Sequence, residues 1–365
     1  MDDSRFKGGI IIMKKKIAML LTAAMVIGLV GCGQAAAPAP VAEAPAAAEE
    51  VKEEAAEATE ATEEAPAEAA ASETYTVGIC QLVEHPALDA ATKGFEDAIV
   101  DALGDAVTFD EQNAQGDSNT CSTIINSFVS NNVNLIMANA TPALQAAAAG
   151  TNEIPILGTS VTEYGVALDI DNFSGTVGGN ISGTSDLAPL DGQADIFTEL
   201  LPDVKKVGLV YCSAEANSQY QVDKVKEYLE AKGITCEYYA FADSNDLSAV
   251  ATSATAECEA LYVPTDNTVA SNAEIIQNIC IPAGIPVVAG EEGICGGCGI
   301  ATLSIDYYDL GVATGKMAVK ILKGEANVSD MAIEYAPEFT KKYNAANCET
   351  LGITVPADYI AIEVE

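Results

Sequence analysis

The chain has 365 residues, with 54 Asp and Glu against 17 Lys and Arg, a single His and no Trp, and its formal charge is −37. So few cations cannot supply the basic surface that nucleic-acid binding needs, so we expect no nucleic-acid partner. Apolar residues make up 49% of the chain, which is enough to bury a core and excludes a protein that is disordered throughout. The length predicts about two domains.

Residues 13–31 have the pattern of a signal peptide. Three lysines, Lys14 to Lys16, precede an apolar run from Ile17 to Val30 that is too short to span a bilayer comfortably. The run ends in Leu-Val-Gly-Cys at Cys32, which resembles the lipobox of bacterial lipoproteins and implies that Cys32 is lipidated. The alternative is a plain secretory signal with a Cys there by chance.

Two flanking segments complete the N-terminal region. Residues 1–12 do not fit a signal peptide, and we interpret them as the product of an upstream mis-start, with Met13 as the true start. After the lipidated Cys32, residues 33–74 contain 18 Ala, 11 Glu and four Pro with almost nothing large. Such a segment cannot bury a core by itself, so residues 32–74 are predicted to be an acidic tether that holds a domain away from a membrane.

Short apolar segments occur twice in the remaining sequence, and the second copies follow the first at a nearly constant offset. The pairs are Val77–Leu82 with Val207–Cys212, Leu135–Thr141 with Leu261–Thr268, and Ile154–Ser160 with Ile285–Glu291. Amphipathic stretches of helical length, such as Leu88–Leu103 and Ser218–Ala231, separate them. This alternation favours βαβ units, so we predict an α/β fold of two similar lobes, each a parallel sheet flanked by helices.

Ligands of open parallel sheets bind beyond the carboxyl ends of the strands. The residues at those ends are polar in both predicted lobes, which indicates a ligand cleft between them. The candidate polar residues are Glu84, His85, Thr141, Thr159, Ser160, Ser213, Asn217, Asp266 and Asn267. A lipid anchor, a tether and a two-lobed cleft together are typical of a receptor that captures small solutes outside the membrane.

Several stretches carry a resemblance to a known family: Val83–Asp89, Asn113–Asp117, Ala140–Ala143, Gly183–Asp186, Ser213–Ser218, Val263–Ser271 and Ile305–Gly311. On these residues the chain resembles the solute-binding lipoproteins of ABC transporters that have the type I periplasmic-binding-protein fold. Within that fold it is similar to the branch associated with uptake of tryptophan and other aromatic amino acids in Gram-positive bacteria.

The resemblance implies a hinge of three chain crossings, near Thr184–Asp186, Ile305–Asp306 and Asn327–Val328. The first lobe would comprise 75–184 plus 306–327, and the second lobe 185–305 plus 328–365. The resemblance also implies closure around the ligand and delivery to an ABC permease with its ATPase. We therefore expect a monomeric binding protein outside the cytoplasm, anchored by lipid, with no enzymatic activity, cofactor or metal.

An amino acid is a zwitterion, so its buried ammonium needs a carboxylate and its carboxylate needs donors. Asp266 is the predicted partner of the ammonium, and the alternative is a helix cap. Arg5 is the only Arg, and it lies before the predicted start at Met13. The ligand's carboxylate is therefore expected to bind hydroxyls and helix N-termini instead of an Arg. The hydroxyl donors would be Thr141, Thr159 and Ser160, unless these residues only cap helices.

The other candidate site residues have less specific roles. His85 is expected in the wall of the cleft or in a hydrogen bond that orders its loop, and Asp306 contacts the ligand or steadies the hinge. Further contacts are expected from Glu84, Ala140, Ser213, Asn217 and Asn267.

Ten cysteines are many for an exported protein. Cys295 and Cys298 have the spacing of a redox pair or of two metal ligands. The sequence has no second Cys-x-x-Cys pair, and the Gly-rich segment is expected to form a turn, whereas a thioredoxin-like motif opens a helix. We interpret them as a disulfide or two free thiols, and most other cysteines as small buried hydrophobes. The rival functions are a thiol oxidoreductase built on Cys295 and Cys298, and the same fold binding a sugar or a nucleoside.

Overall fold

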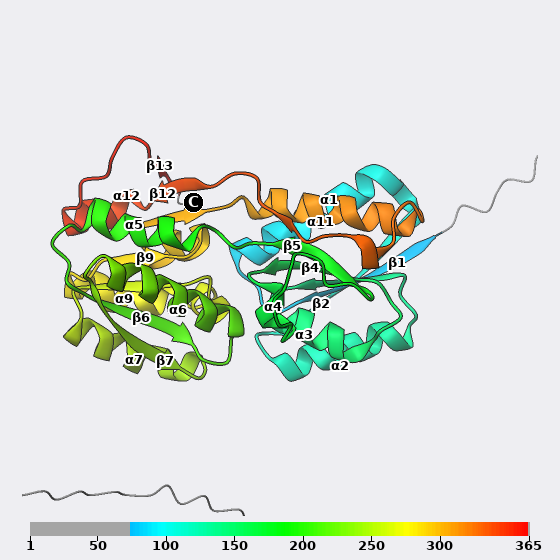
Figure 1. The fold of residues 1–365 in the computed structure, drawn as a ribbon, viewed down its shortest axis with the longest axis horizontal. Helices are drawn as coiled ribbons and strands as arrows, with labels where there is room; N and C mark the ends of the chain where they lie inside the picture. The colour runs from blue at the N-terminus through cyan, green and yellow to red at the C-terminus, as the bar shows by residue number, and fades with distance from the viewer. Residues whose placement is uncertain (1–73, 364–365) are drawn as a thin grey trace, which may run out of the picture. The chain divides into compact units, whose positions relative to one another are not determined.

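A computed structural model of the chain describes residues 74–363, and both lobes fall within one compact unit. The chain runs through the first lobe from blue to green in Figure 1, then through the second, and red marks its C-terminal end. The predicted mis-start, signal peptide, lipidated Cys32 and tether lie outside the described residues. Within the described part, no helix is both long and apolar enough to cross a membrane.

The first sheet has six strands in the order β11-β5-β4-β3-β1-β2, and every neighbouring pair is parallel. In chain order the strands are β1 Tyr75–Gln81, β2 Val107–Asn113, β3 Leu135–Asn139, β4 Ile156–Val161, β5 Ile181–Ser185 and β11 Glu334–Tyr335. The central strands β3, β4 and β5 are buried at every residue, as expected for strands covered on both faces.

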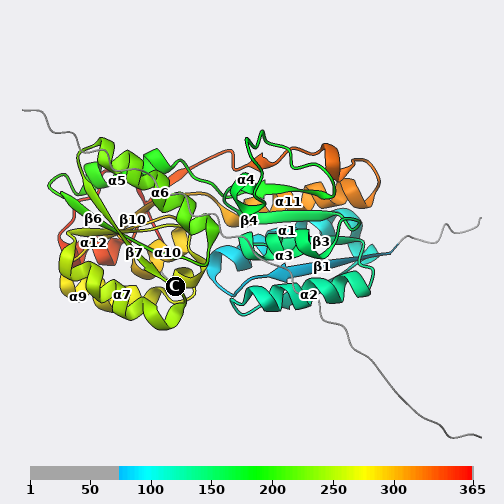
Figure 2. The same ribbon diagram turned by 60° about the horizontal axis from the view of Figure 1, so that its bottom comes forward.

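Helices cover both faces of this sheet. They are α1 Pro86–Leu103, α2 Ser118–Ser130, α3 Thr141–Gly150, α4 Tyr164–Ala167 and α11 Tyr307–Leu322, with the 3₁₀ turns η1 Gly104–Ala106 and η2 Val328–Asp330. Helices α1 and α11 lie side by side in both ribbon views, although they are far apart in the sequence (Figures 1 and 2). The chain thus returns to the first lobe to complete it.

The second sheet has seven strands in the order β13-β12-β10-β9-β8-β6-β7, with one antiparallel pair, β10 and β12. The strands are β6 Lys206–Cys212, β7 Thr235–Phe241, β8 Ala260–Val263, β9 Val287–Ala289, β10 Ala301–Ser304, β12 Thr340–Tyr343 and β13 Ile360–Ala361. The helices of this lobe are α5 Leu190–Leu200, α6 Ala216–Ala231, α7 Ser244–Glu257, α8 Asn267–Ala270, α9 Ala273–Ala283, α10 Glu292–Cys298 and α12 Ala345–Leu351.

The two sheets repeat one another. Strands β5-β4-β3-β1-β2 of the first sheet have the same relative order as β10-β9-β8-β6-β7 of the second. The three pairs of recurring sequence segments coincide with β1 and β6, β3 and β8, and β4 and β9. The predicted fold of two similar α/β lobes is therefore confirmed.

The third crossing, predicted near Asn327–Val328, lies further along the chain. Strand β11 pairs with β5 of the first sheet, and the buried Val328 and Ile333 pack in clusters of the first lobe. Residues 328–335 therefore belong to the first lobe, and assigning them to the second was wrong. The chain crosses between β11 and β12, because β12 pairs with β10 of the second sheet.

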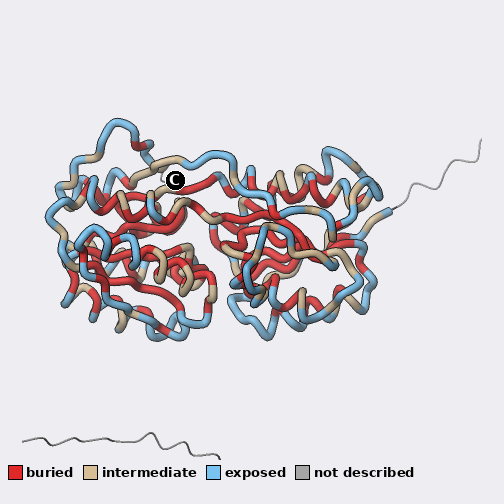
Figure 3. The backbone as a smooth tube through the Cα atoms, in the orientation of Figure 1, coloured by how far each residue is buried: buried red, intermediate tan, exposed pale blue. Residues whose placement is uncertain are grey.

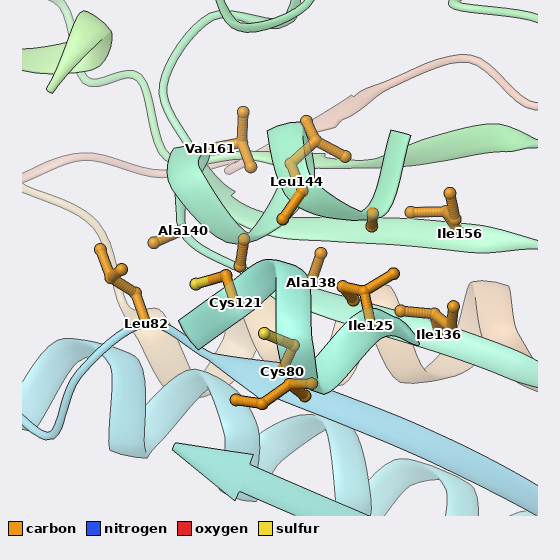
Figure 4. Packing of buried hydrophobic residues seen from close by; sticks show 14 of the residues in the cluster. Cys80, Leu82, Cys121, Ile125, Ile136, Ala138, Ala140, Leu144, Ile156 and Val161 are labelled. Atoms are coloured by element: carbon orange, nitrogen blue, oxygen red, sulfur yellow. The ribbon is translucent and has the colours of Figure 1, made fainter. Parts of the chain in front are cut away.

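Buried residues concentrate in the strands and on the helix faces turned toward them (Figure 3). Figure 4 shows Cys80 and Cys121 among the aliphatic side chains of a first-lobe cluster. The nine cysteines of the described residues are all buried free thiols. Cys295 and Cys298 lie in helix α10 and not in the expected turn, so of the two alternatives the structure has free thiols.

Candidate functional site

Buried polar side chains lie at the carboxyl ends of the strands in both lobes. Two hydrogen bonds cross between the lobes there: His85 Nε2 to Asn267 Oδ1 at 3.2 Å, and Gln221 Nε2 to Thr162 Oγ1 at 3.4 Å. These contacts join the loop after β1 to the start of α8, and the end of β4 to α6. The predicted cleft position is therefore an interface between the lobes lined with polar groups.

His85 has one nitrogen engaged and one without a partner. Asn267 donates its Nδ2 to Glu215 Oε2 at 2.6 Å, which leaves Asn267 Oδ1 as the acceptor that faces His85. His85 Nε2 must therefore carry the proton, and Nδ1 is a buried acceptor with no hydrogen-bond partner. Burial lowers the pKa of His85 below its usual 6.5, so the ring is neutral at pH 7.

Glu215 builds the loop that carries Asn267. Its carboxylate accepts hydrogen bonds from the backbone N–H of Asn267 at 3.0 Å and of Thr268 at 2.9 Å, and from the Thr268 hydroxyl at 2.8 Å. These contacts satisfy the first N–H groups of the short helix α8. Glu215 therefore positions Asn267 for its contact with His85 in the other lobe.

Asp266 is 1% exposed, and both of its carboxylate oxygens are occupied. Oδ2 accepts the backbone N–H of Cys212 at 2.6 Å, and Oδ1 accepts that of Val269 at 2.9 Å. Burial first, and then the nearby charge of Glu215, raise the pKa of Asp266. These bonds favour the alternative that Asp266 caps α8 and ties it to the end of β6.

Two residues beside the cleft have strained backbones. Ala140, between β3 and α3, has φ +89°, and Ser160, near the end of β4, has φ +52°. Residues other than Gly held in such conformations cost about 1–3 kcal/mol each and cluster at binding sites. The backbone N–H of Ala140 donates to Thr159 O at 3.0 Å, which fixes the two turns against each other. The Ser160 hydroxyl is buried with no partner.

The remaining predicted residues divide into buried and exposed groups. Thr141 and Asn217 are buried, and Asn217 Oδ1 has no hydrogen-bond partner. Glu84, Ser213 and Asp306 are exposed. Ser213 donates to Phe241 O at 3.0 Å, and Asp306 accepts the N–H of Asp309 at 3.0 Å as the N-cap of α11.

The Thr159 side chain faces the interior of the first lobe. Its hydroxyl lies 3.2 Å from that of Thr184 and 3.1 Å from that of Thr314, which is on α11. These contacts explain its complete burial without any ligand. Of the three predicted hydroxyl donors, Ser160 alone has a hydroxyl oxygen that is buried without a hydrogen-bond partner.

Asp186, at the first crossing, was not among the predicted ligand contacts. It is 4% exposed; Oδ2 accepts the Tyr307 hydroxyl at 3.0 Å, and Oδ1 is buried without a partner. Burial raises the pKa of Asp186 to about 6, and the hydroxyls of Tyr307 and Thr162 oppose this rise. The available sequence signal is the stretch Gly183–Asp186, which carries part of the family resemblance and contains the predicted first crossing.

Two hollows open between the lobes. A groove of about 860 Å³ is lined by Ala87 and Tyr307 of the first lobe and by Glu291 and Gly296 of the second. A smaller cavity of about 200 Å³ is lined by Leu82 and Pro142 on one side and by Glu215 and Asn267 on the other. The larger volume lies within the range of small-molecule sites. Among the described residues, no cluster of His, Cys, Asp or Glu could hold a metal ion.

The repeated α/β lobes, the three crossings between them and the buried polar interface define a two-lobed binding protein. Residues 76–363 match the family model described as "ABC transporter substrate binding protein". The chain belongs to this family, so it is the extracytoplasmic substrate-binding component of an ABC transporter and not an enzyme.

One known relative and two solved structures are similar to it. A "Tyrosine-binding protein" of Clostridioides difficile (strain R20291) is 37% identical over 263 residues, which are 70% of this chain and 75% of the relative. An ABC domain from Streptococcus pneumonia in complex with L-Trp has a TM-score of 0.75 and 33% identity, covering 78% of this chain and 97% of that one. The ligand-free, open structure of a substrate-binding protein with adhesive properties from Clostridium difficile has a TM-score of 0.62 and 37% identity. The match covers 80% of this chain and 100% of that one.

Proposed function

We propose that this protein captures an L-amino acid with an aromatic side chain, tyrosine or tryptophan, between its lobes and delivers it to an ABC permease. The observation that carries the proposal is the similarity at 37% identity to a protein named for tyrosine binding. The similarity at 33% identity to a structure in complex with L-Trp supports the same ligand class.

The arrangement of the two lobes relative to each other supports capture of the ligand by closure of the lobes. The L-Trp complex has a TM-score of 0.75, whereas the open, ligand-free structure has 0.62 despite its higher sequence identity. The hydrogen bonds His85–Asn267 and Gln221–Thr162 across the interface fit a closed arrangement. A hinge motion that opens the lobes would break both bonds and expose the buried polar groups. Such hinge motions are typical of two-lobed receptors.

The ligand carboxylate would bind at the N-terminus of α3, where the first backbone N–H groups have no partner within the helix. Thr141, the first residue of this helix, is buried, and Pro142 lines the smaller cavity. Ser160 would add its unpartnered hydroxyl. Two donors of this kind can replace the Arg that the described chain lacks.

L-Tyrosine or L-tryptophan should raise the melting temperature of the purified protein. At a ligand concentration of 100 times Kd the stabilisation is about 2.7 kcal/mol, which is roughly 5 °C or more for a protein of this size. Differential scanning fluorimetry and calorimetry should give one ligand per chain. D-tyrosine, glucose and adenosine are the matched controls, and tight binding of a sugar or a nucleoside instead would replace the proposed ligand class.

We further propose that lipid on Cys32 anchors the protein to the outer face of the cell membrane. The apolar run that ends at this Cys and the acidic tract after it support the proposal. One acyl chain alone gives only weak and reversible membrane binding, so a stable anchor needs more than one acyl chain.

Cys32→Ser should abolish labelling by a radioactive fatty acid and release the protein into the medium. The acyl chains are the only membrane attachment that the proposal provides, so the effect should be nearly complete. Fractionation followed by immunoblotting measures it, with Cys121→Ser, at a buried thiol of the folded part, as the control. Unchanged membrane association of Cys32→Ser would contradict the anchor.

A further inference from the structure

A buried ammonium group needs a carboxylate oxygen that is not already committed. Four buried carboxyl groups lie at the interface of the lobes: Asp186, Glu215, Asp266 and Glu291. Glu215 accepts bonds at both oxygens from Asn267 and Thr268, and Asp266 from the N–H groups of Cys212 and Val269. Glu291 caps α10 by accepting the N–H groups of Gly293 and Ile294.

Asp186 differs from the other three. Its Oδ2 accepts the Tyr307 hydroxyl, the Thr162 hydroxyl also lies near the carboxyl group, and Oδ1 is buried without a hydrogen-bond partner. An unpaired carboxylate oxygen in the interior is costly, and a cation that binds there recovers the cost. Resting on the proposed function, we propose that Asp186, and not Asp266, is the carboxylate that binds the ammonium group of the amino-acid ligand.

The position of Asp186 suits a ligand held between the lobes. It follows β5 at the first crossing, where the chain leaves the first sheet (Figure 1). Its backbone N–H donates to Val161 O at 3.3 Å, at the end of β4, beside the unpartnered hydroxyl of Ser160. Thr162, the next residue, bonds to Gln221 on α6 of the second lobe.

A second chain of contacts leads from Asp186 to the larger groove and to the facing lobe. Tyr307, the hydroxyl donor to Asp186, follows the second crossing and lines the groove of about 860 Å³. Gln221 also donates to Asn217 O at 3.2 Å, and Asn217 carries another unpartnered oxygen. A ligand whose ammonium group binds Asp186 therefore contacts the hinge. The positive charge of the ligand acts at the first crossing between the lobes.

The test compares ligands with and without the ammonium group. Calorimetry on the purified full chain would measure L-tyrosine against 3-(4-hydroxyphenyl)propanoate, and L-tryptophan against indole-3-propanoate. Asp186→Asn should weaken amino-acid binding at least thirtyfold, as expected for truncating one partner of a buried charge pair, and leave binding of the desamino acids unchanged or tighter. A merely structural role would weaken all four ligands alike.

Three further variants sharpen the result. Asp191→Asn makes the same change at an exposed residue in the first turn of α5, soon after the first crossing, and should keep the wild-type preference. Asp186→Glu retains the charge, so it should bind more weakly but still prefer amino acids to desamino acids. This variant tests the proposal if Asp186→Asn does not fold. Asp266→Asn tests the competing carboxylate and should keep the preference while lowering the melting temperature.

The outcomes are distinct. If the wild-type chain binds none of the four ligands, the proposed function fails. If it binds the amino acids and Asp186→Asn keeps the wild-type ratio of amino acid to desamino acid, the function stands and the assignment of Asp186 is overturned. Loss of that ratio in Asp266→Asn alone would return the ammonium site to Asp266.

Discussion

Replacing Gly311 by Ala should lower the free energy of unfolding by about 1–3 kcal/mol. Gly311 lies on α11 where this helix packs on α1, and a Cβ there would meet the backbone oxygen of Ala91 at 2.0 Å. Gly94 on α1 is in the converse position, where an added Cβ would meet the backbone oxygen of Tyr308 at 2.1 Å. These are about 1.5 Å inside normal contact, and a backbone oxygen cannot rotate away.

Helix propensity opposes this effect, because Ala is favoured over Gly in a helix by about 1 kcal/mol. The clash should outweigh it, since the two helices must move apart along their contact. They also carry site residues at their starts: α1 follows His85, and α11 begins at Tyr307. Separation should therefore weaken ligand binding as well as stability.

Thermal unfolding followed by circular dichroism measures the loss, with roughly 2–4 °C expected for each kcal/mol. Gly296→Ala is the matched control, because a Cβ on this residue of α10 would have its nearest neighbour, Ile362, at 3.7 Å. That variant should be as stable as the wild type or slightly more so. Equal melting temperatures for Gly311→Ala and the wild type would contradict the close packing of α1 and α11.

The ligand-free protein should lose stability as the pH rises from 6.5 to 8.5. Burial raises the pKa of Glu291 to about 7, opposed by the N–H groups of Ile294 and Gly293 and reinforced by the charges of Glu292 and Asp186. Burial also raises the pKa of Asp266. A carboxyl with a raised pKa in the folded state stabilises fully below its unfolded pKa, about 4, and this stabilisation is lost as pH passes the folded pKa.

The two carboxyls account for the lower part of this range, and buried thiols such as Cys280 and Cys348, whose pKa burial raises, add to the loss near its upper end. Ordinary carboxylates are already ionised above pH 6.5, and His85, whose pKa burial lowers, affects stability only below its unfolded value of about 6.5. Each pKa unit is worth about 1.4 kcal/mol, and only the part of each rise above pH 6.5 counts, so the change should be about 2 kcal/mol and a few degrees in melting temperature.

Fluorimetric melting curves across this range would measure the slope. Glu291→Gln removes one titrating group and should make the slope shallower, whereas Glu292→Gln at the neighbouring, less buried position should leave most of it. A melting temperature that is flat or rises between pH 6.5 and 8.5 would mean that these carboxyls are not neutral in the folded protein.

The local pattern of the sequence was enough to predict the two lobes. Apolar strands such as Val77–Leu82 and amphipathic helices such as Leu88–Leu103 are read from neighbouring residues, and their recurrence as Val207–Cys212 and Ser218–Ala231 indicated a second copy. The observed helices, Pro86–Leu103 and Ala216–Ala231, begin slightly earlier in each case. Periodicity is strong inside an element and weak at its ends, which explains the difference.

The third crossing could not be placed in the same way. Strand β11 is only Glu334–Tyr335, both exposed, so it has no apolar pattern. What assigns it to the first lobe is its pairing with Thr184 and Ser185 of β5, which lie far away in the sequence. So short a strand is defined by its partner, and the partner is known only in the folded protein.

By itself, the sequence determined the fold class, the position of the interface at the carboxyl ends of the strands, and the kinds of residue found there. Only the tertiary structure decided which of those residues are available to a ligand. Asp266 is bonded to the backbone of Cys212, 54 residues away, while Asp186 receives one hydroxyl from Tyr307, 121 residues away, and keeps one oxygen free. The residue type gives a carboxylate its charge, but donors that occupy its oxygens come in part from distant segments of the chain, and only folding brings them to it.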